Sequence, residues 1–428
     1  MQYKNDTPFP LMCLPTRVAG SSRTLTVIVK GTFTLTPNAP CVPAEEQLQF
    51  SGDETYLDDL GRSLCWASDL APFKPHTDFF IIGSYYQPDG NAAPSGRASY
   101  VLGPLTKELV FWGPRVAVQR GDKSWVASDP EPFTTLPLRW EYSFGGLQDR
   151  RNPMGLGIDP EEAPDGTSFI RLPRIEHPDY PLTSLKDRPP PANFAPVPAT
   201  FQTRRRKLGT RDRRWAVFRA PLPPKDYDPS YHNAAPDDQQ AGNYPLGTET
   251  LTLRNLHPRH PVLTVALPGV RPLVGVLRDE SGVITAEEIV MNLDTIVAMP
   301  DSDQLVLLWR GVTGMQAKLP PDEFSVVQCE LARCDAPPTS PSLAERMLAA
   351  DSDAKAEKAA RAQKEVADVL AGVRKLLKGA KLPPEVMNVV ETETDPQVVH
   401  NALDTYLTNF IDGLKQKYPD IVARLQKP

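Results

Sequence analysis

The stretch SLAERMLAADSDAKAEKAARAQKEVADVLAGVRKLLKGAKL, residues 342–382, contains no proline, although the whole chain of 428 residues contains 47. Five prolines follow residue 341, so the other 42 of the 47 lie at or before Pro341. Proline fixes φ and lacks a backbone N–H, which favours short strands, turns and irregular loops in the first part of the chain. The proline-free stretch is rich in alanine, glutamate, lysine and leucine, which are strong helix formers. The sequence therefore predicts a mainly β, antiparallel body with Pro-rich loops, followed by a C-terminal α-helical module.

The length of the chain indicates more than one domain, because a single hydrophobic core rarely extends over so many residues. We place the β-rich body at residues 1–330, a linker at 331–341, and a helical arm with a small helical bundle at 342–428. Residues of about 145–247 have weak strand signals and several Pro-rich patches. We expect this long region to cover the body as loops.

Runs of β-branched and aromatic residues bounded by Pro and Gly mark the expected strands of the body. In LTVIVKGTF, residues 25–33, alternate side chains would face one side of a strand. DFFIIGSYY (78–86) and ELVFWGPRVAV (108–118) predict two further strands. Strand signals return later in the chain at 250–255, 262–267 and 304–310.

The helical module has clear start and stop signals. Ser342 and Glu345 have the spacing of a capping box, and Gly379 with the following proline pair ends the helix. From 349 to 365 the only apolar side chains are alanines, which predicts a solvent-exposed arm. The later apolar stripes would either bury one another or present an apolar face to a partner, and the residues that would do so are Tyr406, Phe410 and Leu414.

Bulk composition favours a protein that stays inside the cell. The formal net charge is −6, which gives no reason to expect general affinity for nucleic acid or anionic lipid. The first 15 residues lack the apolar run of an export signal, and no window resembles a membrane span. Five scattered cysteines suggest reduced thiols. We expect a cytoplasmic protein with no membrane partner.

A basic cluster is the strongest charge feature, and it is flanked by Phe201 and Trp215. It could be a nucleic-acid or phosphate groove with stacking aromatics, a solvated loop, or a patch for an acidic protein partner. Its members are Arg204, Arg205, Arg206, Lys207, Arg211, Arg213 and Arg214.

Catalytic and metal signals are weak. Cys329 and Cys334 have zinc-ligand spacing at one end only, and HPRHP at 257–261 has the prolines of a turn. The sequence has no nucleophile elbow, HExxH motif or phosphate-binding loop. We therefore predict a non-enzymatic protein with no metal and no cofactor, while a hydrolase assembled only by folding stays an alternative.

Several phrases together resemble one bacterial family, the domain of unknown function 2169, over roughly residues 1–315. These phrases are CWASDLAPFKPHTDFFIIG (65–83), LRWEYSFGG (138–146), RNPMGLG (151–157), YHNAAPDDQQ (231–240), LGTETLTLRNLHP (246–258), LPG (267–269) and LDTIVAMPDSDQLVLLWRG (293–311). The resemblance implies an adaptor of the type VI secretion system that binds a toxic effector and loads it onto the VgrG-type spike. The tail beyond about 340 lies outside the shared pattern, as expected if it carries specificity for cargo or spike.

The residues within these phrases could define the fold or contact a partner. Trp140, Tyr142 and Phe144 alternate as in a strand, which would leave Arg139 and Glu141 to pair in solvent on the other face. Asp237–Gln239 would hydrogen-bond their own backbone and lock a loop, and Trp309–Arg310 would end the last strand of the body. The motif residues are Arg139, Trp140, Glu141, Phe144, Gly145, Gly146, Asn152, Pro153, Asp237, Gln239, Asp294, Trp309 and Arg310.

Overall fold

A computed structural model describes residues 2–16, 23–280, 283–315 and 324–417 of the chain. The chain divides into two compact units, residues 1–345 and 346–428. The first is mostly β-sheet and the second is helical, so the predicted fold class is confirmed. Within the described ranges, each helix is too short or too polar to cross a bilayer.

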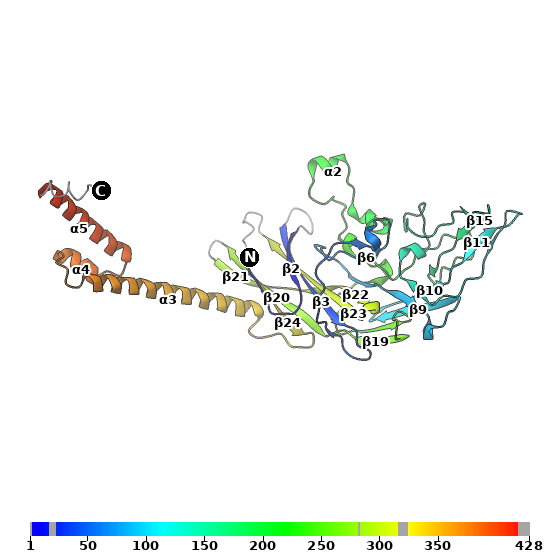
Figure 1. The fold of residues 1–428 in the computed structure, drawn as a ribbon, viewed down its shortest axis with the longest axis horizontal. Coiled ribbons are helices and arrows are strands. Elements are labelled where there is room, and N and C mark those ends of the chain that lie inside the picture. The colour runs from blue at the N-terminus through cyan, green and yellow to red at the C-terminus, as the bar shows by residue number, and fades with distance from the viewer. Residues whose placement is uncertain (1, 17–22, 281–282, 316–323, 418–428) are drawn as a thin grey trace. The chain divides into compact units, whose positions relative to one another are not determined.

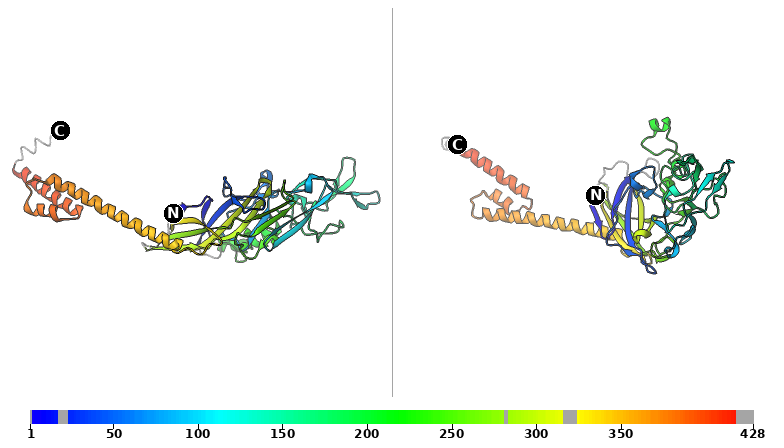
Figure 2. Two further views of the ribbon diagram at one scale, coloured as in Figure 1. Left: turned by 90° about the horizontal axis from the view of Figure 1, so that it is seen from below. Right: turned by 45° about the vertical axis from the view of Figure 1, so that its right-hand side comes forward.

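The largest sheet of the body joins strands from both ends of its sequence (Figures 1 and 2). Its pairing is antiparallel except between β7 and β22, which are parallel. In spatial order the strands are β17 (Gln240–Ala241), β7 (Thr77–Ile81), β22 (Asn292–Met299), β23 (Gln304–Met315), β3 (Arg23–Thr34) and β2 (Leu11–Thr16), with β4 (Val42–Pro43) beside β3.

A second sheet packs against this one and shares its core. Its strands are β16 (Ile175–Glu176), β10 (Leu105–Trp112), β9 (Ser95–Leu102), β18 (Thr250–Arg254) and β19 (Val262–Ala266). Phe79 of β7 meets Tyr100 of β9 edge to face, with ring centroids 4.6 Å apart, and Phe194 lies against Tyr100 at 5.7 Å. The long Pro-rich region therefore contributes side chains to the main core, since Phe194 belongs to it.

Smaller sheets complete the body. One contains β1 (Gln2–Asn5), β24 (Phe324–Arg333), β20 (Val270–Glu280) and β21 (Val283–Ile289), and β1 runs parallel to β24. Another contains β12 (Trp125–Ala127), β11 (Val116–Gln119), β15 (Ser168–Arg171) and β14 (Glu161–Glu162). Two strand pairs remain, β13 (Thr135–Pro137) with β8 (Ser84–Tyr86) and β5 (Glu54–Thr55) with β6 (Leu64–Trp66).

The predicted strand at 25–33 is confirmed as β3, but both of its faces are buried. Leu25, Val27 and Val29 face the core shared with the second sheet. Ile28, on the other face, packs with Leu64, Trp66 and their neighbours. The alternation of apolar residues therefore identified one face correctly and missed the cover on the other.

Two predicted strands are each two strands in different sheets. The stretch 78–86 divides at Gly83 into β7 and β8, and 108–118 divides at Gly113 into β10 and β11. A Cβ on Gly113 would lie 1.6 Å from the carbonyl oxygen of Glu131, so only glycine permits this close approach. Pro114 then removes a donor that a continuous strand would need.

The end of the body also differs from the prediction. Trp309 and Arg310 lie within β23, which continues to Met315, and β24 follows as a further strand. The alternation of apolar residues did not predict β24, because this strand begins after a break in the alternation. It also extends past residue 330.

The helical unit follows its predicted signals. The long helix α3 (Leu343–Leu377) begins after Ser342. The Ser342 Oγ accepts from the backbone N–H of Glu345 at 3.2 Å, and the Glu345 carboxylate accepts from the backbone N–H of Ser342 at 2.8 Å. Gly379 has φ of +92° and lies before α4 (Pro384–Thr392), which α5 (Pro396–Lys417) follows. A small core of Leu370, Val390 and Val399 joins the three helices. Residues 418–428, the end of the predicted module, lie outside the described residues.

Candidate functional site

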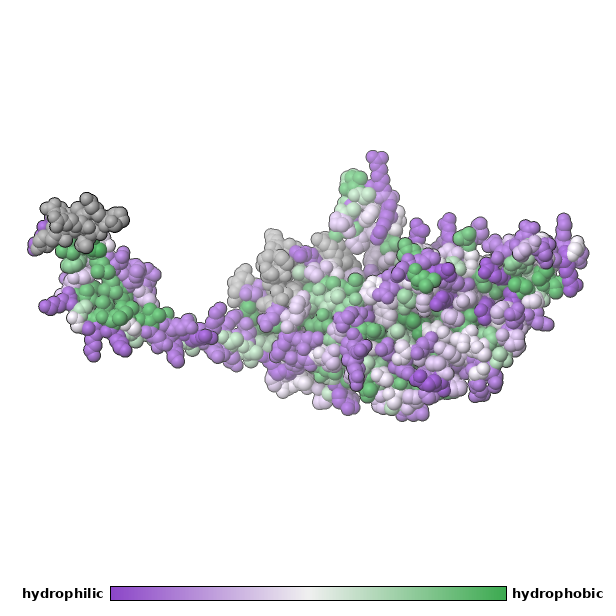
Figure 3. Space-filling view, viewed as in Figure 1, coloured by the Kyte–Doolittle hydropathy of each residue, from purple (hydrophilic) through white to green (hydrophobic). Residues whose placement is uncertain are grey.

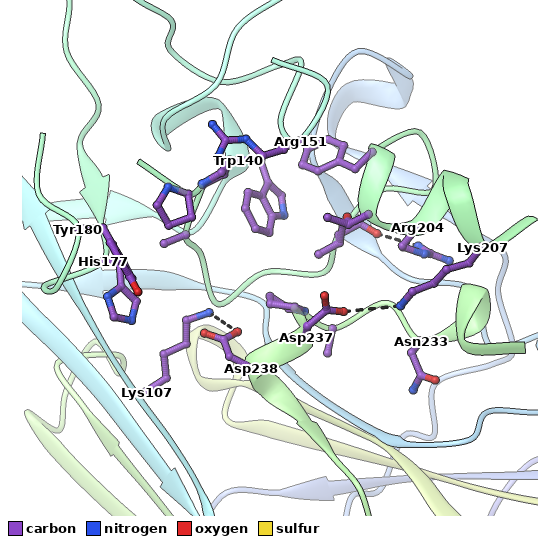
Figure 4. A pocket seen from close by; sticks show the side chains of 18 residues that line it. Lys107, Trp140, Arg151, His177, Tyr180, Arg204, Lys207, Asn233, Asp237 and Asp238 are labelled. Atoms are coloured by element: carbon purple, nitrogen blue, oxygen red, sulfur yellow. Dashed lines mark hydrogen bonds and ion pairs between the residues drawn. The ribbon is translucent and has the colours of Figure 1, made fainter. Parts of the chain in front are cut away.

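The long region of the body folds around a cavity of about 450 Å³, which we call the Trp140 pocket (Figure 4). It takes its wall from segments far apart in the sequence. The residues that define it are Lys107, Trp140, Phe201, Arg204, Lys207 and Asp237. Three of the predicted sites, the RWEY phrase, the basic cluster and the Asp237 loop, meet here.

Trp140 forms the apolar wall of the pocket and is itself held firmly. Its indole N–H donates to the carbonyl of Pro196 at 2.8 Å, and its ring lies edge to face with Phe201 at 5.4 Å. The Asn152 side chain donates to the Trp140 carbonyl at 2.9 Å. These contacts fix the ring in one orientation.

The predicted strand through Trp140 is wrong, because Trp140–Tyr142 form the short 3-10 helix η3. Arg139 and Glu141 do not pair with each other. The Arg139 guanidinium lies 3.9 Å from the centroid of the Tyr56 ring. Glu141 accepts from the backbone N–H of Ser63 at 3.1 Å and from its hydroxyl. The motif therefore clamps the loop 56–63, far away in the sequence.

That clamped loop exposes two leucines at a strained turn. Leu57 has φ of +62°, and Asp58 has φ of +55°. Both values are uncommon for residues with a side chain, and such strain persists where surrounding contacts enforce it. Leu57 and Leu60 are 84% and 86% exposed. The motif thus holds apolar side chains out toward solvent.

A second cavity of about 630 Å³ lies beside this loop, and Pro153, Met154, Leu60 and Leu147 line it. Leu147 is 90% exposed. Together with the clamped loop it forms an apolar rim, which suits contact with another protein.

The glycine motifs at 145–146 and 155–157 bring two stretches of backbone together. The N–H groups of Gly145 and Gly146 donate to the carbonyls of Leu156 and Asn152. A Cβ on Gly145 would lie 2.1 Å from the Asn152 carbonyl oxygen. Phe144 is buried and its backbone forms a bridge with Leu156. Asn152, itself fully buried, donates to the Phe144 carbonyl at 3.0 Å.

The loop 231–240 is locked to the body rather than to itself. Gln239 lies in the 3-10 helix η6 (Asp237–Gln239) and donates from its side chain to the carbonyls of Phe79 and Phe194, at 2.9 and 3.1 Å. Lys107 reaches Gln239 at 2.8 Å and Asp238 at 2.9 Å. Asp237 pairs with Lys207 at 3.6 Å (Figure 4).

Asp294 and Arg310 form a buried ion pair beneath the largest sheet's surface. Asp294 lies at a β-bulge of β22, where the register with β23 shifts between Leu293 and Thr295. Arg310 also donates to the carbonyl of Asp69 at 2.8 Å. Trp309, on the opposite face, packs against Phe9 and Phe33. These four motif contacts stabilise the fold.

A second buried pair ties the loop 231–240 to β7. Asp78 accepts from the Lys74 ammonium at 2.8 Å, from the Asn233 side chain at 2.9 Å and from the backbone N–H of Ala234 at 2.8 Å. The buried Asp78 carboxylate therefore adds a further attachment between β7 and the loop that carries Asp237.

Burial shifts the pKa values of groups in and near the pocket. Burial lowers the pKa of Lys107, and Asp238 opposes this shift. Burial, helped by the positive charges of Lys74, Arg204 and Arg310, lowers the pKa of His232 to about 3. His232 is therefore neutral at physiological pH.

The basic cluster does not form one continuous patch. Arg204 is buried in α1 (Gln202–Arg205), and Lys207 lies in η4 (Arg206–Leu208) at the pocket wall. Phe201 is a core residue, so it cannot stack on a nucleic-acid base. The remaining arginines are exposed, and the last two begin α2 (Arg213–Phe218), which stands away from the sheets in Figure 1.

Cys329 and His257, which the sequence singled out, are both buried in the body. Burial raises the pKa of Cys329 to about 12, which makes it an unreactive thiol. His257 contacts Asp303 at 2.7 Å and accepts from the backbone N–H groups of Arg259 and His260. Among the residues that the structure describes, no cluster of His, Cys, Asp and Glu is arranged to hold a metal ion.

In the helical unit, Tyr406 and Phe410 stack with ring centroids 6.0 Å apart. Phe410 and Leu414 are 51% and 37% exposed. Hydrophobic residues gather on this unit in the space-filling view of Figure 3. The stripe therefore leaves an apolar face at the surface of the helices.

Several pocket residues could not be recognised from the sequence. Lys107 belongs to a strand of the second sheet, while Arg151, His177 and Tyr180 come from irregular segments. No spacing links them, because folding alone brings them together. The burial of Arg204 had one weak signal, its position next to the aromatic Phe201.

A protein-family model described as "Uncharacterized protein conserved in bacteria (DUF2169)" matches residues 20–310. The match covers most of the body, including the whole Trp140 pocket, and leaves the helical unit outside. Comparison with curated proteins and with solved structures gives no match.

Proposed function

The chain belongs to the bacterial DUF2169 family, and from this premise we propose that it is a non-enzymatic adaptor of the type VI secretion system. It binds a toxic effector in the cytoplasm and helps to load that effector onto the VgrG-type spike. The family match carries no function of its own, so the proposal rests on the sequence resemblance and on the surfaces of the two units.

The observation that favours an adaptor is that each unit has its own exposed apolar surface. The body presents Leu57 and Leu60 on its clamped loop, and the helical unit presents Phe410 and Ile411, which are 51% and 47% exposed. A protein that joins two partners needs two such surfaces, and exposed apolar patches often mark interaction sites.

The Trp140 pocket offers polar contacts in addition to its apolar wall. Lys107 and Lys207 are each paired with a carboxylate, at 2.9 and 3.6 Å. These pairs place charged groups on the cavity wall, which suits the binding of a polar part of a protein partner.

The test is co-purification of the tagged full-length chain from the bacterium that produces it. We expect the effector and the spike protein to be captured together. The Leu60→Glu variant should capture only one of the two partners. The Phe410→Glu variant should capture only the other. Val42→Glu, at a residue 53% exposed in β4, is the matched control and should keep both.

Two results would contradict the adaptor. One is a wild-type chain that captures neither effector nor spike. The other is normal secretion of the effector from cells that lack this protein.

A further inference from the structure

We propose that the Trp140 pocket binds a carboxylate carried on an apolar peptide segment, with Arg204 as the anion-binding residue. The proposal rests on the proposed function in one respect, that the segment belongs to a protein partner. The carboxylate can come from a peptide C-terminus or from an Asp or Glu side chain beside an apolar residue.

The charge balance of the pocket leaves one cation without a partner. Four cationic side chains line it, and three have a carboxylate: Lys107 with Asp238, Lys207 with Asp237, and Arg151 with Asp149. In the part of the chain that the structure describes, no carboxylate forms an ion pair with the fourth, Arg204. The pocket therefore carries one uncompensated positive charge.

Arg204 is buried and held in place, with an exposed fraction of 7%. Its Nε donates to the carbonyl of Tyr231 at 3.0 Å, and Nη1 donates to the carbonyl of Val197 at 2.7 Å. The guanidinium also lies over the Tyr231 ring, 5.2 Å from its centroid.

These contacts orient the guanidinium without neutralising it. A guanidinium has five N–H donors, and the two carbonyls use only part of that set. A buried charge without a counter-ion is unfavourable, and a ligand carboxylate would remove that cost while accepting the remaining donors.

The rest of the wall indicates what the carboxylate is attached to. Trp140 and Phe201 meet edge to face, and Pro190, Pro191 and Pro236 line the same cavity. The Trp140 N–H already donates to the Pro196 carbonyl, so the indole brings no free donor to the cavity. A cavity of about 450 Å³ accommodates a few residues of peptide.

The test uses ligand-observed NMR titration of three short peptides against the full-length chain. The first is N-acetyl-Gly-Ser-Leu with a free C-terminal carboxylate, and the second is its amide. The third is the amide of N-acetyl-Ser-Glu-Leu, which carries its carboxylate on a side chain. We expect saturable binding of the first or the third peptide, at least tenfold tighter than binding of the second.

Variants assign the binding to Arg204. Arg204→Gln should weaken it at least tenfold, and Arg205→Gln, an exposed neighbour in α1, should change it less than twofold. Asp237→Asn removes a competing negative charge from a side chain that is 66% exposed, so it should tighten binding even if Arg204→Gln fails to fold.

The site is overturned if neither acidic peptide binds, if the neutral amide binds equally well, or if Asp237→Asn weakens binding. These outcomes are independent of the adaptor test, because that test measures capture of whole proteins from cells. Peptide binding with no captured effector or spike would keep the carboxylate site and remove the adaptor. Captured partners with no peptide binding would keep the adaptor and remove the carboxylate site.

Discussion

Both carboxylate oxygens of Glu141 accept hydrogen bonds from Ser63, a residue 78 positions earlier in the chain. Its neighbour Trp140 also donates its backbone N–H to the Ser63 hydroxyl, at 2.7 Å. Ser63 is fully buried, so these bonds are shielded from water. At the scale of single residues, the RWEY phrase acts as an anchor for the loop that exposes Leu57 and Leu60.

Replacing Glu141 by alanine should destabilise the body by about 1–3 kcal/mol, since the buried N–H and hydroxyl of Ser63 lose their acceptor. Urea unfolding followed by tryptophan fluorescence measures this change. Limited proteolysis should also cut the loop 56–63 faster in the variant. Glu46→Ala, at an exposed residue, is the control, and an equal loss of stability in both variants would refute the anchor.

The sequence identified many of the important residues but not their partners. Glu141 and Arg139 were expected to pair because they are close in sequence and alternate with aromatic residues. Their actual partners, Ser63 and Tyr56, lie in another segment. Spacing describes only neighbours along the chain, so contacts made by folding over such distances could not be predicted.

Elements were predicted best where one period applied to the whole segment. The alternation at 25–33 predicted β3, and the capping box with Gly379 predicted the limits of α3 closely. Strands that divide at a glycine, such as β10 and β11 at Gly113, were missed because a neighbouring backbone imposes the break. The β-bulge at Asp294 was also missed, because the alternation of apolar residues does not reveal it.

Asp78→Asn tests how β7 holds the loop 231–240. The substitution removes the carboxylate that forms an ion pair with the buried Lys74 ammonium. Breaking one side of a buried pair typically costs about 3–5 kcal/mol, and we expect a loss of that size in urea unfolding. Asp129→Asn, at an exposed residue, should leave the midpoint unchanged. A decrease in the free energy of unfolding of less than 1 kcal/mol for Asp78→Asn would contradict the proposed role of Asp78 in holding the loop 231–240.

At the scale of the whole molecule, the chain has two compact units with separate cores. All six tryptophans lie at or before Trp309, so tryptophan fluorescence reports on the body alone. Helical circular dichroism at 222 nm reports mainly on α3, α4 and α5. The two units can therefore be followed independently in the same sample.

Leu370→Ala should lower the midpoint of the thermal transition seen by circular dichroism and leave the fluorescence transition in place. Leu370 is 5% exposed in the small helical core, where such a truncation costs about 2–5 kcal/mol. Leu376→Ala, at a residue 85% exposed, is the control within the same helix. A common shift of both signals would mean that the units unfold as one.

The pairing of β1 with β24 has a consequence for synthesis on the ribosome. β1 can pair only after Phe324–Arg333 have been synthesised, so the sheet that contains it cannot be completed until nearly all residues of the body have been made. Pairing of β1 is therefore a late step of folding during synthesis, and β1 stays without its partner strand while the earlier strands of the body form their sheets.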